Sequence, residues 1–247
     1  HNDYLYMKYK NSEVFSFNAS SNPNLECIQV DDVNNVPANW IKDESTDYNL
    51  DCYFGDTYVP DDNFEQALIN LGYDVGPLND YVPTINIESI TILDISGNAI
   101  SDLTGLEDFL ALENFNCSNN TISAVDLSAN TNLLEVNCSN NLLDVIDISS
   151  NTLISNLNCS NNSINSLDLN ANTNLTILDI SNNIFTSFNP TDVLSLQVFN
   201  CDDNAIVELD FQQNQALINI SCQSNALETL NIRNGQNAIL TDLNALN

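Results

Sequence analysis

The chain has 247 residues, of which 34 are acidic and only four are lysine or arginine, so its formal net charge at pH 7 is −30. A surface of this charge repels nucleic-acid phosphates and anionic membranes, and no apolar run is long enough to span a bilayer. We therefore expect no nucleic-acid partner and no membrane insertion. The acid attracts cations or basic partners, or it simply keeps a large surface soluble.

Residues 1–56 form a loop-rich segment. Its stretch Asn22-Pro-Asn-Leu-Glu-Cys-Ile-Gln-Val30 resembles the closing strand of an array of repeats, and Leu5-Tyr-Met-Lys8 resembles Leu230-Asn-Ile-Arg233 near the end of the chain. We expect residues 1–56 to be the closing strand or cap of a preceding repeat array, followed by a linker. If the protein is extracellular, Cys27 and Cys52 are expected to form a disulfide.

Residues 57–90 are predicted to be an N-terminal cap with a helix near 61–71. Pro60 and the acidic Asp61 favour the start of that helix, and Gly72 favours its end. Apolar side chains between them recur at helical spacing and are expected to cover the first repeat. These residues are Phe64, Leu68 and Leu71.

Residues 91–247 contain a repeated motif in which an apolar residue precedes Asn-Cys-Ser-Asn-Asn or a close variant. Each unit reads L-x-x-L-x-L/C-x-x-N-x-L, which predicts a short parallel strand with alternate side chains in the core. The final asparagine is expected to bond to buried turn backbone. These asparagines recur at one fixed interval, at Asn120, Asn141, Asn162, Asn183, Asn204 and Asn225.

A second apolar pattern, such as Val125-Asp-Leu127, recurs in the same register. Each turn therefore has two apolar edges and little room for a helix. The spacing predicts a narrow solenoid of about seven turns over residues 91–247, lacking a C-terminal cap of its own.

These motifs resemble the leucine-rich repeat family, and in particular the nested 21-residue repeats of secreted and surface proteins of Bacteroidota. The stretch from Leu93 to Leu106 is similar to an internalin-type repeat, and the resemblance covers about residues 85–247. It implies a right-handed solenoid of stacked short parallel strands, with little helix apart from a short cap helix. It also implies an extracellular or bacterial cell-surface location.

One column of the repeat is occupied by cysteine, except for Ile180. Because isoleucine fits there, the thiols are predicted to be buried and free. The chain has no CxxC pair and no histidine beyond His1, so we expect no metal site of the zinc type. The cysteines of this column are Cys117, Cys138, Cys159, Cys201 and Cys222.

The candidate binding residues form a polar ladder on the strands. The resemblance places this ladder on the concave side, which is the usual binding surface of the family. Its amides are alternatively explained by stacking, in which neighbouring asparagines bond to each other. The ladder residues are Asn116, Asn137, Asn158, Asp179, Asn200 and Ser221.

A ladder of acids lies on the second apolar edge. Carboxylates on adjacent rungs invite a divalent cation such as calcium, although a solvated acidic stripe is the explanation that we favour. Nothing in a row of equivalent acids raises one pKa above another, so a glycosidase pair is not expected. The residues are Asp126, Asp147, Asp168 and Asp210.

The chain lacks the groups that catalysis needs, since a Ser-His-Asp or Cys-His arrangement cannot be assembled from a terminal histidine. We expect a non-catalytic recognition or adhesion module that binds a protein or glycan and has no cofactor. The alternative to having no cofactor is calcium on the acidic ladder. The alternative is a structural unit, in which tandem or head-to-tail solenoids form a stalk or filament and the partner is the next copy.

Overall fold

The computed structural model describes residues 3–6, 17–22, 25–29, 36–44, 46–49, 55–236 and 239–245. The chain divides into two compact units, residues 1–56 and residues 57–247, each with its own hydrophobic core. Within the described residues, no helix combines the length and apolar character needed to cross a bilayer.

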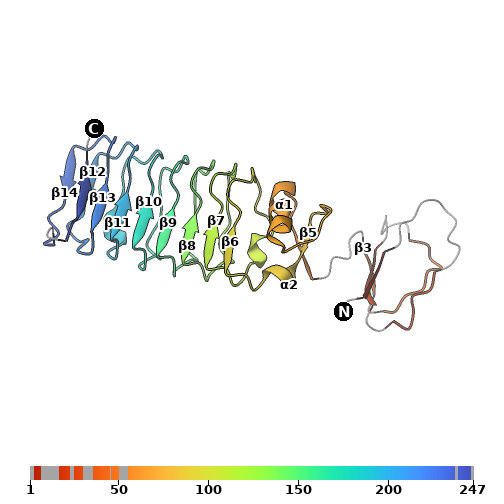
Figure 1. The fold of residues 1–247 in the computed structure, drawn as a ribbon. Helices are drawn as coiled ribbons and strands as arrows, with labels where there is room; N and C mark the ends of the chain where they lie inside the picture. Colours follow the sequence, from red (N-terminus) through yellow and green to blue (C-terminus); the bar gives the residue numbers. More distant parts are fainter. Residues whose placement is uncertain are drawn as a thin grey trace. The chain divides into compact units, whose positions relative to one another are not determined.

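The second unit is built on an eight-stranded parallel sheet (Figure 1). From β7 to β13 each strand pairs with the one a single period further on, so that Asn116 lies opposite Asn137. The predicted solenoid of stacked short parallel strands is confirmed. The strands are β6 (Ile92–Asp94), β7 (Asn114–Asn116), β8 (Glu135–Asn137), β9 (Asn156–Asn158), β10 (Ile177–Asp179), β11 (Val198–Asn200), β13 (Asn219–Ser221) and β15 (Asp242–Asn244).

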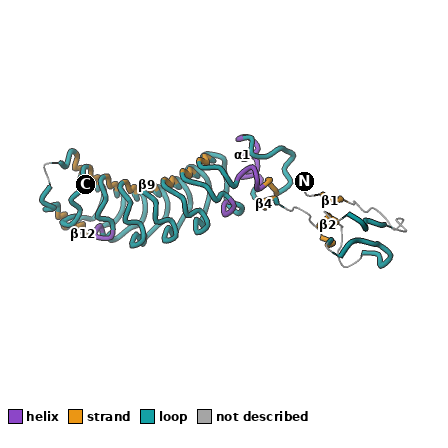
Figure 2. Tube along the Cα trace, turned by 90° about the horizontal axis from the view of Figure 1, so that it is seen from below, coloured by secondary structure: helices purple, strands orange, loops and turns teal. Residues whose placement is uncertain are grey.

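The solenoid is curved, and the sheet lies along its concave side (Figure 2). On the opposite side, β12 (Glu208–Asp210) and β14 (Thr229–Asn231) form a parallel pair. The other described turns there are irregular, apart from 3₁₀ turns at Leu106–Asp108 and Pro190–Asp192. The second apolar edge therefore crosses each described turn without an α-helix, which agrees with the little helix that the sequence predicts.

Buried asparagines hold each turn to its neighbour. The Nδ2 of Asn141 donates to the carbonyl of Cys138 in its own turn and to that of Cys117 one turn earlier, both at 3.0 Å. Its Oδ1 accepts from the N–H of Ile122 at 3.0 Å. The predicted role of this column in satisfying turn backbone is confirmed.

The residue before each of these asparagines has a left-handed backbone, with φ between 50° and 57°. Asparagine and aspartate tolerate this conformation better than other non-glycine residues. That preference explains the paired asparagines of the motif. The residues concerned are Asn119, Asn140, Asn161, Asn182, Asp203 and Ser224.

A second column of buried amides lies near the other edge of each turn. The Nδ2 of Asn151 donates to the carbonyls of Leu127 and Asn130, both at 2.9 Å. The Oδ1 atoms of this column are buried and have no hydrogen-bond partner within the described solenoid. The members are Asn130, Asn151, Asn172 and Asn214.

The N-terminal end of this unit is covered by helix α1 (Asp62–Leu71), strands β4 (Asp56–Tyr58) and β5 (Tyr81–Pro83), and the short helix α2 (Thr84–Ile87). The predicted cap helix is confirmed, and Gly72 ends it with φ of 82°. Its predicted apolar stripe is buried except for Leu71, which is 44% exposed. Leu71 lies at the last helical position, and Tyr73 just beyond the helix packs against the core instead.

The first unit contains a parallel sheet in the order β1–β2–β3, formed by β1 (Asp3–Tyr6), β2 (Leu25–Gln29) and β3 (Asp47–Asn49). Its small core contains Ala19, Leu25 and Ile28. The predicted disulfide cannot be placed, because Cys52 and the side chain of Cys27 lie outside the described residues.

Candidate functional site

The third residue of each strand forms one polar column along the concave sheet. The register pairs these residues directly, from Asp94 in β6 to Asn244 in β15. All six candidate binding residues belong to this column, and each is half-buried. The structure thus aligns Asn116, Asn137, Asn158, Asp179, Asn200 and Ser221 on one face.

The side-chain oxygens of this column cap the turn that follows each strand. The Oδ1 of Asn158 accepts from the N–H and the hydroxyl of Ser160 at 3.0 and 2.8 Å. The Oδ1 of Asp179 accepts from the same groups of Ser181 at 2.9 and 2.7 Å. These side-chain oxygens therefore already accept hydrogen bonds within their own turns. In a continuous stack of asparagines, they would instead accept from the amide of the neighbouring rung.

Bonds between neighbouring rungs occur where an amide faces a carboxylate. The Nδ2 of Asn200 donates to Asp179 Oδ2 at 3.2 Å, and the side chain of Asn116 bonds to Asp94. In the described solenoid, no protein group accepts from the Nδ2 of Asn137 or Asn158. The expected stacking of asparagine on asparagine is thus wrong at these rungs, and their N–H groups remain available on the concave face.

Half of the column borders a shallow hollow of about 380 Å³ over β6 to β9. Two carboxylates, Asp94 and Glu135, and the exposed side chain of Ile92 are among its lining residues. The Nδ2 of Asn114 donates to Glu135 Oε2 at 3.1 Å, which orients that carboxylate. The amides that line the hollow are Asn114, Asn116, Asn137, Asn156 and Asn158.

Sequence reasoning found only part of this hollow. It identified Asn116, Asn137 and Asn158, while Asp179, Asn200 and Ser221 lie further along the same face. It missed the first-position column, which includes Asn114 and Asn156. The sequence could have indicated this column, because side chains alternate between the two faces of a strand. The first and third residues of a three-residue strand therefore point to the same face.

The acidic ladder lies on the second apolar edge of the turns, and its side chains are exposed. The Oδ1 atoms of Asp126 and Asp147 each accept from the N–H two residues on, of Ser128 and Ser149, at 2.9 Å. Side-chain and backbone hydrogen bonds from these serines hold the pKa of both carboxyls below the ordinary value. Asp168 and Asp210 cap Asn170 and Gln212 in the same way.

The cysteine column is buried and reduced, as predicted. Burial raises the pKa of Cys138 to about 12 and that of Cys222 to about 11. Both remain protonated at neutral pH, so neither thiol is a nucleophile in the folded protein.

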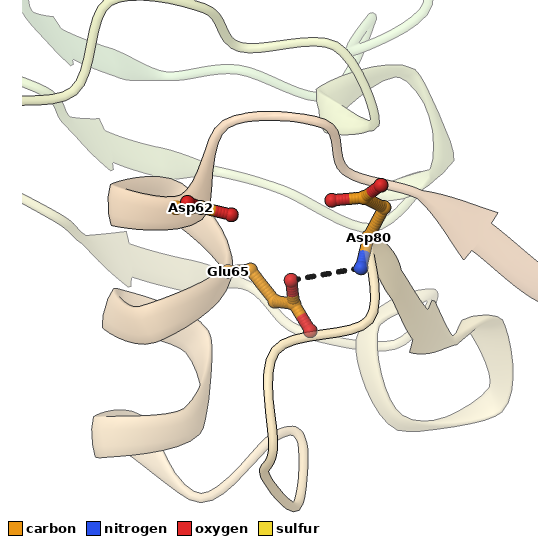
Figure 3. Close-up of side chains that lie close together, drawn as sticks. All are labelled: Asp62, Glu65 and Asp80. Atoms are coloured by element: carbon orange, nitrogen blue, oxygen red, sulfur yellow. Dashed lines mark hydrogen bonds between the residues drawn. The ribbon is translucent and has the colours of Figure 1, made fainter.

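A cluster of three acids in the cap lies outside the sequence predictions. Ligand atoms of Asp62, Glu65 and Asp80 lie within 4.8 Å of one another (Figure 3). Glu65 is buried, and its two oxygens accept from the N–H groups of Asn79 and Asp80 at 2.8 and 3.0 Å. The carboxylate of Glu65 thus clamps the cap loop, a role that no local sequence motif indicates.

No protein-family profile and no curated protein matches the chain. Among solved structures, internalin C2 of Listeria monocytogenes is 19% identical and superposes with a TM-score of 0.56, over 77% of this chain and 95% of that protein. A leucine-rich repeat protein of Leptospira interrogans is 20% identical, with a TM-score of 0.53 over 63% of this chain and 40% of that protein.

The functional domain of InlJ from Listeria monocytogenes, which includes a cysteine ladder, is 22% identical over 77% of this chain and 61% of that protein. Its TM-score of 0.36 is too low to support a comparison. The chain spans less than two thirds of the InlJ functional domain and of the Leptospira protein. The superpositions on internalin C2 and on the Leptospira protein agree with the stacked parallel strands described above. The chain therefore has the fold of the bacterial leucine-rich repeat proteins.

Proposed function

We propose that the chain is a non-catalytic recognition module whose concave hollow binds a basic segment of another protein. The observation that carries this proposal is the combination of unpaired amide donors with the carboxylates Asp94 and Glu135 in one hollow. Amide groups recognise peptide backbone, and the carboxylates favour lysine or arginine side chains. The exposed Ile92 in the lining of the hollow adds an apolar contact.

A glycan is the less favoured ligand. Sugar sites commonly use an aromatic platform, whereas the exposed side chains of the described concave face are amides, carboxylates and aliphatic groups. The lining residues also argue against catalysis, because the described lining of the hollow contains no thiol, imidazole or hydroxyl nucleophile.

The setting of this module is part of the proposal. The constant spacing of the repeats supports placing it among the nested repeats of Bacteroidota surface proteins, and adhesion outside the cell is the role that such a placement implies. A strongly acidic surface fits that role, because it attracts basic partners over long range.

The test is to probe arrays of peptides of graded charge, together with arrays of glycans, with the labelled chain. We expect binding to lysine- and arginine-rich peptides, at least tenfold weaker for Glu135→Lys than for the unchanged chain. Asp147→Lys makes the same change in net charge on the other edge and should bind nearly as well. Equal losses of binding in both variants would show that only the overall charge matters. Binding to glycans alone would contradict a protein ligand.

A further inference from the structure

Carboxylates occupy alternate rungs of the concave sheet. The sheet stacks the strands from β6 to β11 in chain order, and three acids lie on them, namely Asp94 in β6, Glu135 in β8 and Asp179 in β10. The strands β7, β9 and β11 contain only uncharged residues. Successive carboxylates are therefore two rungs apart, which is about 9.6 Å in a sheet whose strands are about 4.8 Å apart.

The outer two of these rungs have the same sequence. Both β6 and β10 read Ile-Leu-Asp, so that Ile92 accompanies Asp94 and Ile177 accompanies Asp179. Both isoleucine side chains are exposed, by 64% and 39%. The concave face thus presents an apolar side chain beside a carboxylate, and it presents the same pair again four rungs later, at a distance of about 19 Å.

Amide donors lie between the outer carboxylates. Asn137 on β8 and both Asn156 and Asn158 on β9 line the hollow. Within the described solenoid, no protein group accepts from the Nδ2 atoms of these three residues. A ligand that follows the row of carboxylates passes over these N–H groups, and it satisfies them only if its own backbone carbonyls are free.

The polyproline II conformation fits both the spacing and the donors. It has three residues per turn and a rise of about 3.1 Å per residue, so every third side chain lies on one edge, about 9.3 Å from the last, and its carbonyls are not bonded internally. An extended strand covers a similar length in three residues, but its side chains alternate, so every third one faces away. An α-helix returns to one face only after seven residues and about 10.5 Å, and its carbonyls are already bonded.

We infer that the basic segment bound by this module is a proline-rich stretch in the polyproline II conformation, with lysine or arginine at every third position. It lies along the solenoid axis, and its basic side chains pair in turn with Asp94, Glu135 and Asp179. The prolines between them contact Ile92 and Ile177, while backbone carbonyls accept from the free amides of the hollow. The inference rests on the proposed function, because it specifies the sequence and conformation of the partner at the same site.

The ligand backbone lies between two columns of side chains. Asp94 and Asp179 are the third residues of their strands, whereas Glu135 is the first residue of its strand. The two columns are about 6.7 Å apart along the strands. A lysine has a flexible stem of four carbons, so basic side chains on one edge of the ligand can reach either column.

The test is isothermal titration calorimetry of the whole chain with blocked peptides of about seven residues that carry the same charge. One has lysine at positions 1, 4 and 7 and proline elsewhere, and a second has the same composition with lysine at positions 1, 3 and 5. A third keeps the first spacing but replaces every proline by glycine, which removes the preference for polyproline II. We expect the first peptide to bind at least about tenfold more tightly than either of the others.

A double variant tests the spacing from the side of the protein. Asn114→Glu combined with Glu135→Asn moves the middle carboxylate to the next rung and keeps both the net charge and the composition. We expect it to bind the first peptide about tenfold more weakly and to bind the second as the unchanged chain does. Asp179→Asn should weaken the first peptide about fivefold, whereas Asp147→Asn removes the same charge from the other edge and should bind nearly as well.

The outcomes separate this inference from the proposed function. Equal affinity for the first two peptides, or no loss in the double variant, would overturn the polyproline II partner. The proposed function would still hold in that case if both peptides bind and both lose affinity in Glu135→Lys. If none of the basic peptides binds, both the inference and the proposed function are wrong.

Discussion

The first and last described turns of the solenoid differ in how deeply they bury the same core column. At the N-terminal end Leu93 is buried, because helix α1 brings Phe64 and Leu68 over the first turn. At the other end the equivalent Leu243 is exposed. The repeat buries its apolar edges only against another turn, so termination requires residues that the repeat does not contain.

Removing an aromatic anchor of the cap should produce the largest effect. Phe64 is fully buried and stacks on Phe109 with ring centroids 6.4 Å apart. We expect Phe64→Ala to lower the free energy of unfolding by about 3–5 kcal/mol. Urea unfolding measures this loss, with Leu243→Ala in the last described strand as the control, for which we expect less than about 1 kcal/mol. Similar losses of unfolding free energy in Phe64→Ala and Leu243→Ala would contradict this difference in burial.

Glycine substitutions provide a second comparison of the ends. A Cβ at Gly105, where φ is 103°, would lie 2.8 Å from the carbonyl oxygen of Tyr58 in the cap. At Gly235, where φ is 77°, the same Cβ would meet nothing within 4 Å. We expect Gly105→Ala to destabilise the protein by about 2–3 kcal/mol and Gly235→Ala by about 1 kcal/mol, in the same unfolding assay. Equal losses would show that strain alone, and not the cap contact, decides the effect.

Asp61 joins the cap to the first turn and should make stability depend on pH. Its carboxylate accepts from the N–H groups of Phe64 and of Asp102, and from the N–H and hydroxyl of Ser101. Partial burial raises the pKa of Asp61, but these hydrogen bonds outweigh it and the net pKa is lowered. A lowered folded-state pKa stabilises the protein above about pH 4, and this stabilisation is lost as the pH falls through the folded-state value.

The variant Asp61→Asn keeps a capping side chain but removes the charge. We expect a loss of about 1 kcal/mol at pH 7 and a smaller decline of stability between about pH 4 and pH 2, as measured by thermal melts. Asp62→Asn, at the neighbouring exposed acid, should change either quantity by less than about 0.5 kcal/mol. If the stability of Asp61→Asn declines at acid pH as steeply as that of the unchanged chain, other carboxylates cause the pH dependence.

The smallest effect concerns the thiols. Cys222 lies directly after β13, the neighbour of the last described strand, and Cys138 lies in the middle of the solenoid; both are buried. Opening of the last turns should expose Cys222 first, so it should be alkylated faster than Cys138 in the native protein. Mass spectrometry after timed labelling measures the order. Equal rates would indicate that the last described turns open no more readily than the middle of the solenoid.

Most of the fold could be predicted from sequence because its period is strict. The columns at Asn141 and Cys138 repeat at a constant spacing, and their burial follows from the alternation of a short strand. The second amide column at Asn151 is equally periodic, but Val193 interrupts it and no simple motif explains a buried amide there. The exposed Leu71 shows that helical spacing predicts a face but not where the covering helix stops.

The candidate site was only partly predictable. Asn137 could be placed on the concave face from its register alone, since every neighbour is one period away. The depth of the hollow, and the unpaired state of its amides, depend on which oxygens the turns consume. The clamp of Glu65 on Asp80 depends on the path of a cap loop that no repeat determines.

The hydrogen bonds of Asn141 have a consequence for how the number of repeats changes in evolution. Its amide joins its own turn to the one before, through atoms that recur identically one period earlier and later. Duplicating or deleting one whole period therefore returns every amide to an equivalent set of partners. Gene slippage can lengthen or shorten the middle at little energetic cost, whereas the N-terminal cap, which no repeat can replace, has to stay intact.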